Sequence, residues 1–210
     1  MSDDQPPLNR RRFFREGLRH LIRGVADSVE GVQDAIESTA AARAAPSHRA
    51  VMIPPNVHLR PPGALPESQY LDTCTRCGDC VKACPVQCIR VDPTGKKAGG
   101  APYIDPDTAA CSVCEFLSCM DACPSGALVP VPLNRIRMGT AVLRDEACIR
   151  TKGEECRICV EKCPLGTAAI DIVANRVEVN PLGCTGCGSC QHYCPTSPKS
   201  IVVIPIAARG

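Results

Sequence analysis

Apolar residues in the first part of the chain recur at helical spacing. Seven of them follow one another at steps of three or four positions: Phe14, Leu18, Leu21, Val25, Val29, Val32 and Ile36. That spacing places them on one face of a helix, and the opposite face carries arginines first and acidic residues behind them. Acids toward the C-terminal end oppose the helix macrodipole, so the isolated helix should have modest stability. We expect residues 1–44 to hold an amphipathic helix that docks on the body of the protein or on a partner, with peripheral membrane contact through residues 10–37 as the alternative.

The pattern changes twice further along the chain. Residues 45–69 are rich in proline and have little periodicity, which predicts an extended strap or linker. From residue 70 onward four cysteine-rich segments repeat, and each ends in Cys-Pro and a short apolar run that we interpret as a strand: "IRV", "ALVPV", "AAIDI" and "SIVVI". The repeats occupy residues 74–91, 111–131, 148–172 and 184–204. With short helices in the intervals, residues 70–210 are predicted to form an α+β domain of small β-hairpins and short helices.

The composition is unusual for a chain of 210 residues, a length that suits one or two domains. There is no Trp, and there are only three Phe and three Tyr, whereas Cys occurs 17 times and Pro 20 times. An ordinary aromatic and aliphatic core therefore has little material. The net charge is +2 and no basic face is evident, so nucleic acid is not an expected partner.

The cysteine spacing is the most specific signal. The first repeat ("CTRCGDCVKACP") and the fourth ("CTGCGSCQHYCP") both read C-x2-C-x2-C-x3-C-P. The second widens one gap to C-x2-C-x4-C-x3-C-P, and the third displaces its first cysteine to C-x7-C-x2-C-x3-C-P. In bacterial two-cluster ferredoxins the last cysteine of such a run ligates the neighbouring 4Fe-4S cluster. Four complete runs predict four 4Fe-4S clusters, held in tandem or nested two-cluster ferredoxin modules.

Zinc and disulfides are the competing interpretations. Structural zinc uses paired C-x2-C knuckles separated by a dozen or more residues, which would leave the third and fourth cysteines of each run unexplained. Disulfides between such close neighbours would be strained. The seventeenth cysteine, Cys88, belongs to no quartet, and we interpret it as a small buried apolar residue.

Two schemes of ligand exchange are open. The rival scheme pairs neighbouring repeats, the first with the second and the third with the fourth. Similar spacing favours a nested scheme that pairs the first repeat with the fourth and the second with the third. The nested scheme predicts four ligand groups: Cys74, Cys77, Cys80 and Cys194; Cys111, Cys114, Cys119 and Cys163; Cys148, Cys156, Cys159 and Cys123; and Cys184, Cys187, Cys190 and Cys84.

Glycines and prolines beside the cysteines complete the expected sites. Gly78 and Gly188 are predicted to let the backbone approach a cluster closely. A proline after the last cysteine of each run should turn the chain away from the cluster: Pro85, Pro124, Pro164 and Pro195.

Residues 10–15, "RRRFFR", match the start of a twin-arginine export signal. Such a signal needs an apolar segment of about 7 to 15 residues after the basic start. Here charged residues from Arg19 to Glu37 interrupt every such window. We therefore expect a cytoplasmic protein, with membrane association through residues 10–37 left open and export to the periplasm as the alternative.

Several segments extend the likeness to a known group beyond the cysteines: "RPPGALPESQYLDTCTRCGDCVKACP", "CSVCEFLSCMDACPSGAL", "RMGTAVL" and "CTGCGSC". Over roughly residues 60 to 204 the chain resembles the NapG and MauM type of ferredoxin-like proteins. The resemblance implies a four-cluster electron-transfer protein associated with nitrate reduction or methylamine oxidation. It also implies redox partners such as a quinol-linked membrane complex or a molybdoenzyme.

The expected function is electron relay as a subunit or partner of an oxidoreductase, without catalysis of its own. The four histidines (His20, His48, His58 and His192) are scattered, and no constellation of a nucleophile and a base is evident. His192, between two cysteines, is interpreted as a solvated residue or one that supports a ligand. A maturation factor that activates another redox enzyme is the alternative from a different class. A zinc-bound structural adaptor is the third interpretation.

Overall fold

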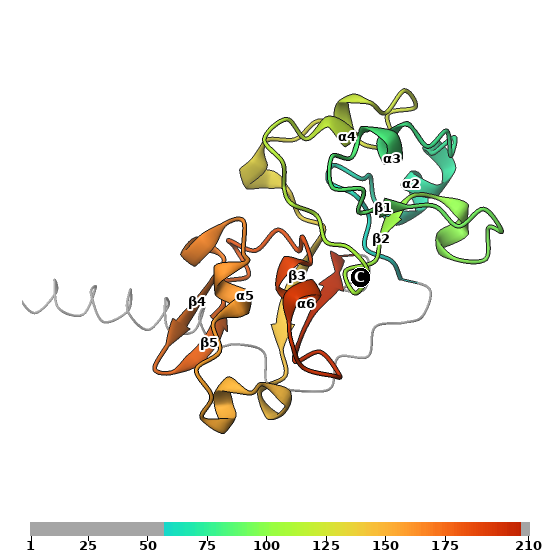
Figure 1. The fold of residues 1–210 in the computed structure, drawn as a ribbon. Helices are drawn as coiled ribbons and strands as arrows, with labels where there is room; N and C mark the ends of the chain where they lie inside the picture. Colours follow the sequence, from blue (N-terminus) through green and yellow to red (C-terminus); the bar gives the residue numbers. More distant parts are fainter. Residues whose placement is uncertain (1–56, 207–210) are drawn as a thin grey trace, which may run out of the picture. The chain divides into compact units, whose positions relative to one another are not determined.

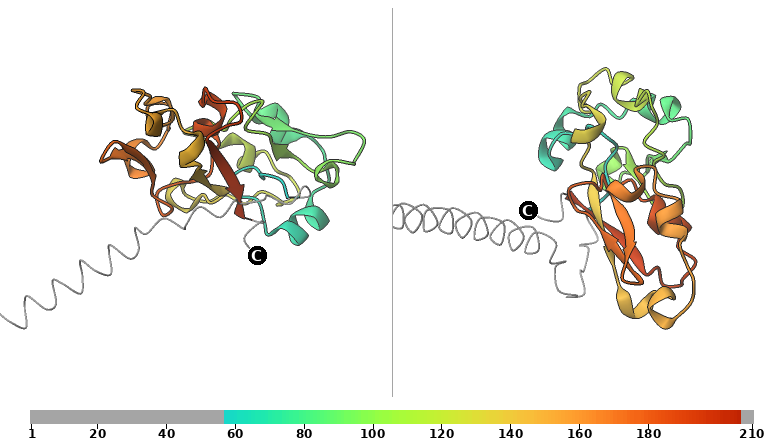
Figure 2. Two further views of the ribbon diagram at one scale, coloured as in Figure 1. Left: turned by 90° about the horizontal axis from the view of Figure 1, so that it is seen from below. Right: turned by 90° about the vertical axis from the view of Figure 1, so that its left-hand side faces the viewer.

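A computed structural model describes residues 57–206. The predicted N-terminal helix, the twin-arginine-like segment and most of the Pro-rich segment lie outside these residues. The described chain falls into two halves, which we call the N-terminal half (57–135) and the C-terminal half (136–206). Figures 1 and 2 show them as separate regions, blue to green and yellow to red. Each half contains two of the four cysteine repeats.

The N-terminal half is built from very short elements. In chain order they are α2 (Glu67–Thr73), α3 (Asp79–Ala83), β1 (Ile89–Arg90), the 3-10 turn η1 (Ala98–Gly100), β2 (Tyr103–Ile104), α4 (Ser118–Asp121) and η2 (Leu133–Arg135). Strands β1 and β2 pair antiparallel, with Ile89 opposite Ile104. Helix α3 packs against α4, so the helical turns of the first and second repeats lie side by side (Figure 1).

The C-terminal half repeats this plan with longer strands. Its elements are β3 (Gly139–Leu143), η3 (Asp145–Ala147), η4 (Arg150–Lys152), α5 (Ile158–Glu161), η5 (Gly166–Ala168), β4 (Ile170–Val173), β5 (Arg176–Val179), α6 (Ser189–Tyr193) and β6 (Ile201–Pro205). Strand β3 pairs antiparallel with β6, and β4 pairs with β5. The β4–β5 turn consists of Ala174 and Asn175, both at positive φ, as a two-residue hairpin of the right twist requires. Helix α5 packs against α6.

Three of the four predicted strands exist. The runs "IRV", "AAIDI" and "SIVVI" contain β1, β4 and β6. The prediction for "ALVPV" was wrong: Leu128 makes an isolated bridge to Ala64, and no strand follows. Pro130 interrupts this run, and a proline cannot donate to a ladder.

The position of the helices also corrects the prediction. Of the α-helices in the described chain, α3, α4, α5 and α6 lie inside the repeats, and the intervals between repeats hold mainly 3-10 turns and strands. Each of these four helices carries the third cysteine of its run: Cys80, Cys119, Cys159 and Cys190. The helices are only four or five residues long because the crossing cysteine and its proline follow at once.

The described end of the Pro-rich segment is part of the core. Leu59 bridges to Ile104 and Ala64 bridges to Leu128. Arg60, only 7% exposed, holds Glu67 and donates to the carbonyl oxygens of Ala98, Ala101 and Pro102. Residues 57–66 therefore act as a strap that closes the N-terminal half.

Cysteines make up much of the buried interior. Aliphatic side chains such as Ile136, Ile201 and Leu128 are buried with them, and Tyr70 is one of the few buried aromatic residues. No helix within residues 57–206 has the length and apolar character needed to cross a membrane.

Candidate metal centres

The cysteines gather into four sets, each with three members from one repeat and a crossing member from another. We name each set after the repeat that supplies three cysteines. The first set is Cys74, Cys77, Cys80 and Cys123; the second is Cys111, Cys114, Cys119 and Cys84; the third is Cys148, Cys156, Cys159 and Cys194; and the fourth is Cys184, Cys187, Cys190 and Cys163.

Three of the sets line cavities. The first lines a cavity of about 280 Å³, the second one of about 310 Å³ and the fourth one of about 330 Å³, each volume including the open mouth. The third set is brought together around α5: burial and the nearby thiols of Cys156 and Cys148, with Cys194 also close, raise the pKa of Cys159 to about 11. Each of the three cavities is therefore lined by cysteines from two repeats.

The structure brings together the local groups and not the nested ones. The nested scheme puts Cys194 with Cys74 and Cys123 with Cys148, whereas Cys123 lies in the cavity of the first repeat and Cys194 lies near Cys159. Cys84 likewise joins the second repeat, and Cys163 joins the fourth. The nested scheme rests on the similar cysteine spacing of the paired repeats. The packing of α3 on α4 and of α5 on α6 decides the grouping, because it places sequence neighbours face to face.

Glycines at two helix starts shape the loops. Gly78 and Gly188 stand immediately before α3 and α6 with φ of 78° and 86°, a left-handed conformation that favours glycine. Both residues line the cavities of their sets. A Cβ on Gly78 would meet nothing within 4 Å, whereas one on Gly188 would lie 2.8 Å from the Cβ of Pro106. The positive φ therefore explains why glycine is favoured at both positions. At Gly188 the close contact with Pro106 is a second reason, because it leaves no room for a side chain.

Two of the prolines sit in hydrogen-bonded turns. The amide of Gln87 donates to the carbonyl of Cys84, and the amide of Gly166 donates to the carbonyl of Cys163. Pro85 and Pro164 occupy the second position of these turns, where proline is favoured. Pro124 and Pro195 follow the other two crossing cysteines in the same way along the sequence. That these prolines turn the chain away from a cluster stays a prediction.

Burial disfavours the thiolate form of several of these cysteines. It raises the pKa of Cys80 to about 11 and those of Cys119 and Cys187 to about 12, and neighbouring thiols add to the effect. A thiol that coordinates a metal ion is deprotonated outright, because the cation supplies the missing positive charge. Buried thiols that lie close together therefore suit an iron-containing cofactor, because the iron ions would supply the positive charge that stabilises the thiolates.

Cys194 behaves differently. Burial raises the pKa of its thiol, but the side-chain hydroxyls of Ser200 and Thr196 outweigh burial and bring the pKa down to about 7. Both hydroxyl oxygens lie 3.2 Å from its Sγ atom. Ser200 is 3% exposed, so this hydrogen bond is shielded from water.

The donor set fits a 4Fe-4S cluster. Within residues 57–206 no three His, Cys, Asp or Glu side chains converge tightly enough to hold one metal ion; the thiols surround cavities instead. A single zinc ion would hold its sulfurs at about 2.3 Å. In the fourth set the hydroxyl of Thr185 is buried and makes no hydrogen bond within the described residues, and the residue lines the cavity. A sulfur acceptor inside the cavity would satisfy this hydroxyl.

Cys88 has a neighbour that the sequence did not reveal. It is 1% exposed, which confirms its burial, but its Sγ lies 3.6 Å from that of Cys84, and it lines the cavity of the second set. Its thiol also hydrogen-bonds to Cys111 and lowers the pKa of Cys111. The position four residues after a crossing cysteine could have signalled this, because Ala127 holds the same place beside the first set.

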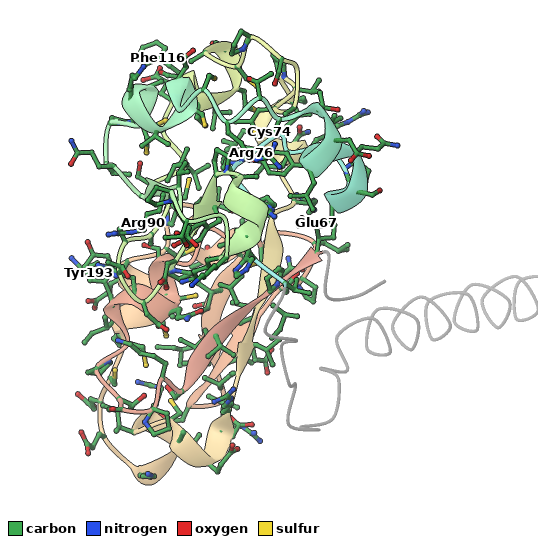
Figure 3. The ribbon with its side chains drawn as sticks, turned by 90° about the vertical axis from the view of Figure 1, so that its right-hand side faces the viewer. Glu67, Cys74, Arg76, Arg90, Phe116 and Tyr193 are labelled. Carbon is green, nitrogen blue, oxygen red and sulfur yellow. The ribbon has the colours of Figure 1, made fainter. Side chains whose placement is uncertain are left out.

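Cationic side chains donate hydrogen bonds to the backbone carbonyl oxygens of cysteines in two sets. Arg76 donates to the carbonyl of Cys74 at 3.0 Å, and Figure 3 shows the two residues next to each other. In the third set, Arg150 donates to the carbonyl of Cys156 at 3.1 Å and Lys199 to that of Cys194 at 2.6 Å. Spacing alone did not identify these contacts, because Arg76 and Arg150 occupy variable positions between the cysteines and Lys199 follows the last cysteine of its run.

The four sets lie next to one another in a definite order. The second set adjoins the first through Cys119 and Cys80. It adjoins the fourth through Cys111, whose amide donates to the carbonyl of Cys187 at 3.0 Å. The fourth adjoins the third through Cys190 and Cys159. The spatial order is therefore first, second, fourth, third, and it differs from the order along the chain.

Residues of α6 hold the junction between the halves. Gln191, 8% exposed, donates to Asp107 at 2.9 Å and accepts from the amide of Val203 at 2.7 Å. The Nδ1 atom of His192 lies 3.0 Å from the carbonyl oxygen of Pro106. His192 thus supports the segment before Cys111 and makes no contact with a cysteine thiol that would assign it to a set.

Comparison with known proteins agrees with this arrangement. Residues 73–127 and residues 140–195 each match a 4Fe-4S dicluster domain family, so each match covers two neighbouring repeats. The chain is 36% identical over 208 residues to the methylamine utilization ferredoxin-type protein MauM of Methylophilus methylotrophus, covering 93% of this chain and 86% of that protein. It is 34% identical over 227 residues to the ferredoxin-type protein NapG of Escherichia coli (strain K12), covering 100% of this chain and 92% of that protein.

Fold, cysteine sets and domain matches define a ferredoxin-type iron-sulfur protein that carries electrons on 4Fe-4S clusters. Four of the short helices in the described residues each carry a cysteine of one set. The chain belongs to the family of ferredoxin-type proteins that includes NapG and MauM.

Proposed function

We propose that this protein holds four 4Fe-4S clusters, one in each cysteine set, and relays single electrons in the order first, second, fourth, third. When bound, each cluster takes up and releases one electron. The contact between Cys111 and Cys187 is the observation that carries the proposal, because it joins the two halves at their second and fourth sets. It places a cysteine of one two-cluster half directly beside a cysteine of the other.

The protein's own residues provide the path and its shielding. The cysteines of the second and fourth sets that face the junction are buried, Cys111 and Cys187 both at 7% exposure. Gln191 and His192 fix the segment before Cys111 against α6. In the first set Cys77 is exposed. The first set is thus the place where a partner can approach the relay directly.

The partner is a redox protein, such as a quinol-linked membrane complex or a molybdoenzyme. Support comes from the relatives, whose names include ferredoxin-type proteins of methylamine utilization. We propose a cytoplasmic address with a docking helix in residues 1–44. Fusing residues 1–50 to a reporter that is active only after export in the folded state tests it, and efficient export would overturn it.

The relay order has a direct test. Anaerobically purified full-length protein should contain about 16 Fe and 16 acid-labile sulfides per chain. A Cys156→Ser variant that lacks the third cluster should still pass electrons from the first cluster to the fourth, as measured by rapid-freeze EPR after a substoichiometric pulse of reductant. Relay in chain order would instead isolate the fourth cluster in this variant.

A Cys84→Ser variant is the matched comparison. It should lose the second cluster and isolate the first from the other two. If electrons still reach the fourth cluster at the wild-type rate, the proposed path is wrong. If deletion of the protein stops only the appearance of active partner enzyme and leaves steady electron flow intact, the maturation role replaces the relay.

A further inference from the structure

The four crossing cysteines occupy the same place in their repeats but have different neighbours. The Sγ of Cys194 has two hydroxyls at 3.2 Å, those of Thr196 and Ser200. Cys123 has one hydroxyl, that of Ser125, at 3.6 Å, and Cys84 has the thiol of Cys88 at 3.6 Å. For Cys163 the contacts that affect its thiol come from the backbone and from Cys184. The third set therefore receives the strongest side-chain hydrogen bonds.

Ligation fixes the direction of these hydrogen bonds. A cysteine sulfur bound to iron has no proton and can only accept, so the hydroxyls must donate. Thr196 is arranged for this, because its oxygen already accepts from the amide of Ser200 at 2.8 Å and its proton is left for the sulfur. The hydroxyls point the positive ends of their dipoles at the ligand sulfur.

Cations reinforce the same site. Lys199 and Arg150 donate to the carbonyl oxygens of Cys194 and Cys156, two cysteines of the third set. Glu154 and Glu155 also flank Cys156 along the chain, but both are exposed, where water and salt screen their charge. Hydrogen bonds to sulfur and nearby positive charge both favour the reduced form of a cluster, which carries one more negative charge.

We infer that Thr196 and Ser200 make the cluster of the third set the most easily reduced of the four. The inference rests on the proposed four-cluster relay and gives it a direction. The third set stands at the end of the spatial order, so an electron entering at the first set settles at the far end. Thr196 and Ser200 are positioning residues that act through the sulfur of Cys194.

The test is a potentiometric titration of the full-length protein followed by EPR. In the wild type, the signal that appears first on reduction should be the one that a Cys156→Ser variant lacks. A Thr196→Val, Ser200→Ala double variant should require about tenfold more reducing conditions for that signal, which is about 59 mV for a one-electron couple. Each single variant should give a smaller shift in the same direction, and the other three signals should stay in place.

Two controls separate this effect from a loss of structure. Thr196→Ser keeps the hydroxyl and should restore the wild-type titration. Ser189→Ala removes another buried hydroxyl of the same half, one that donates to the carbonyl of Lys162 at 2.8 Å, and should move no signal. If a variant at position 196 or 200 fails to fold, Lys199→Met provides an independent measurement with a shift in the same direction.

Distinct outcomes overturn the inference and the proposed function. Full iron content with unmoved potentials in the single and double variants rules out the role of Thr196 and Ser200 alone. The same holds if Cys156→Ser removes a signal other than the first to appear. Wild-type protein with far fewer than about 16 Fe per chain after anaerobic purification contradicts the four-cluster relay itself.

Discussion

The first and fourth repeats have the same cysteine spacing and opposite surroundings. Their second cysteines are equivalent in sequence, yet Cys77 is exposed and Cys187 is only 7% exposed. The reason lies outside both repeats. The segment that leads from β2 to Cys111 runs over the fourth repeat, where Pro106 meets Gly188 and Asp107 meets Gln191. Equal motifs thus leave the second cysteine exposed in the first repeat and buried in the fourth.

The comparison shows what a cysteine motif leaves undecided. A Cβ added to Gly78 would have no neighbour within 4 Å, while Gly188 is tightly packed, although both glycines adopt the same left-handed conformation. The motif requires the conformation, and the neighbouring segment adds the packing. An exposed first set suits contact with a partner, and a closed fourth set suits transfer within the chain.

The largest expected effect comes from removing iron, which should abolish the difference between the repeats altogether. With so few aromatic side chains, the buried cysteines have no other strong support, and metal-binding energy becomes folding energy. Chelation after anaerobic reduction should leave a largely unfolded chain, as circular dichroism would show. A cooperative, native-like melt of the iron-free protein would contradict this expectation.

Next in size is the loss of a single cluster through its crossing cysteine. Cys123→Ser should remove the cluster of the first repeat, and Cys163→Ser that of the fourth, each lowering the iron content from about 16 to about 12 per chain. Iron analysis and EPR of both variants check this. Loss of the fourth repeat's signal in Cys84→Ser, with the second repeat's signal kept, would restore the nested scheme.

A smaller effect should separate the two glycines. Gly78→Ala forces a side chain into the left-handed region and should cost about 1 to 2 kcal/mol. Gly188→Ala adds the clash with Pro106, so overpacking should add about 1 to 3 kcal/mol. Because unfolding with clusters is not expected to be two-state, the readout is the bleaching half-time in anaerobic denaturant, which should shorten more for Gly188→Ala. Equal half-times would mean that the junction does not constrain the fourth repeat.

The smallest effect concerns oxidant attack on the folded protein. Exposed cluster edges are reached first, so brief air exposure should bleach the cluster of the first repeat several-fold faster than that of the fourth. EPR of samples quenched over time, with the Cys123→Ser and Cys163→Ser variants to assign the signals, measures the ratio. Gln191→Leu, which removes the hydrogen bond to Asp107, should bring the two rates closer together. A fourth cluster that bleaches first in the wild type would refute the assignment of open and closed sites.

The cysteine spacing is enough to identify the chemistry. Four runs that close in Cys-x3-Cys-Pro identify the cluster family, because such close thiols serve neither zinc knuckles nor unstrained disulfides. Three of the four apolar runs after the prolines were also recognisable as strands, since short β-branched segments favour strands wherever they pair. Local residue order is enough for these conclusions.

Three features depend on packing: which cysteines lie together, the order in which the sets adjoin, and which cysteines are exposed to water. Cys123, Cys88 and Ser200 show why. Cys123 joins the first set because α3 packs on α4. Cys88 and Ser200 lie close to the sulfur atoms of crossing cysteines a few residues earlier in the chain. Cysteine spacing carries no information about these packing partners. Similar spacing pointed to the nested scheme, whereas the contacts of α3 with α4 and of α5 with α6 bring neighbouring repeats together. The burial of Cys187 likewise follows from the course of residues 105–110, a segment outside every motif.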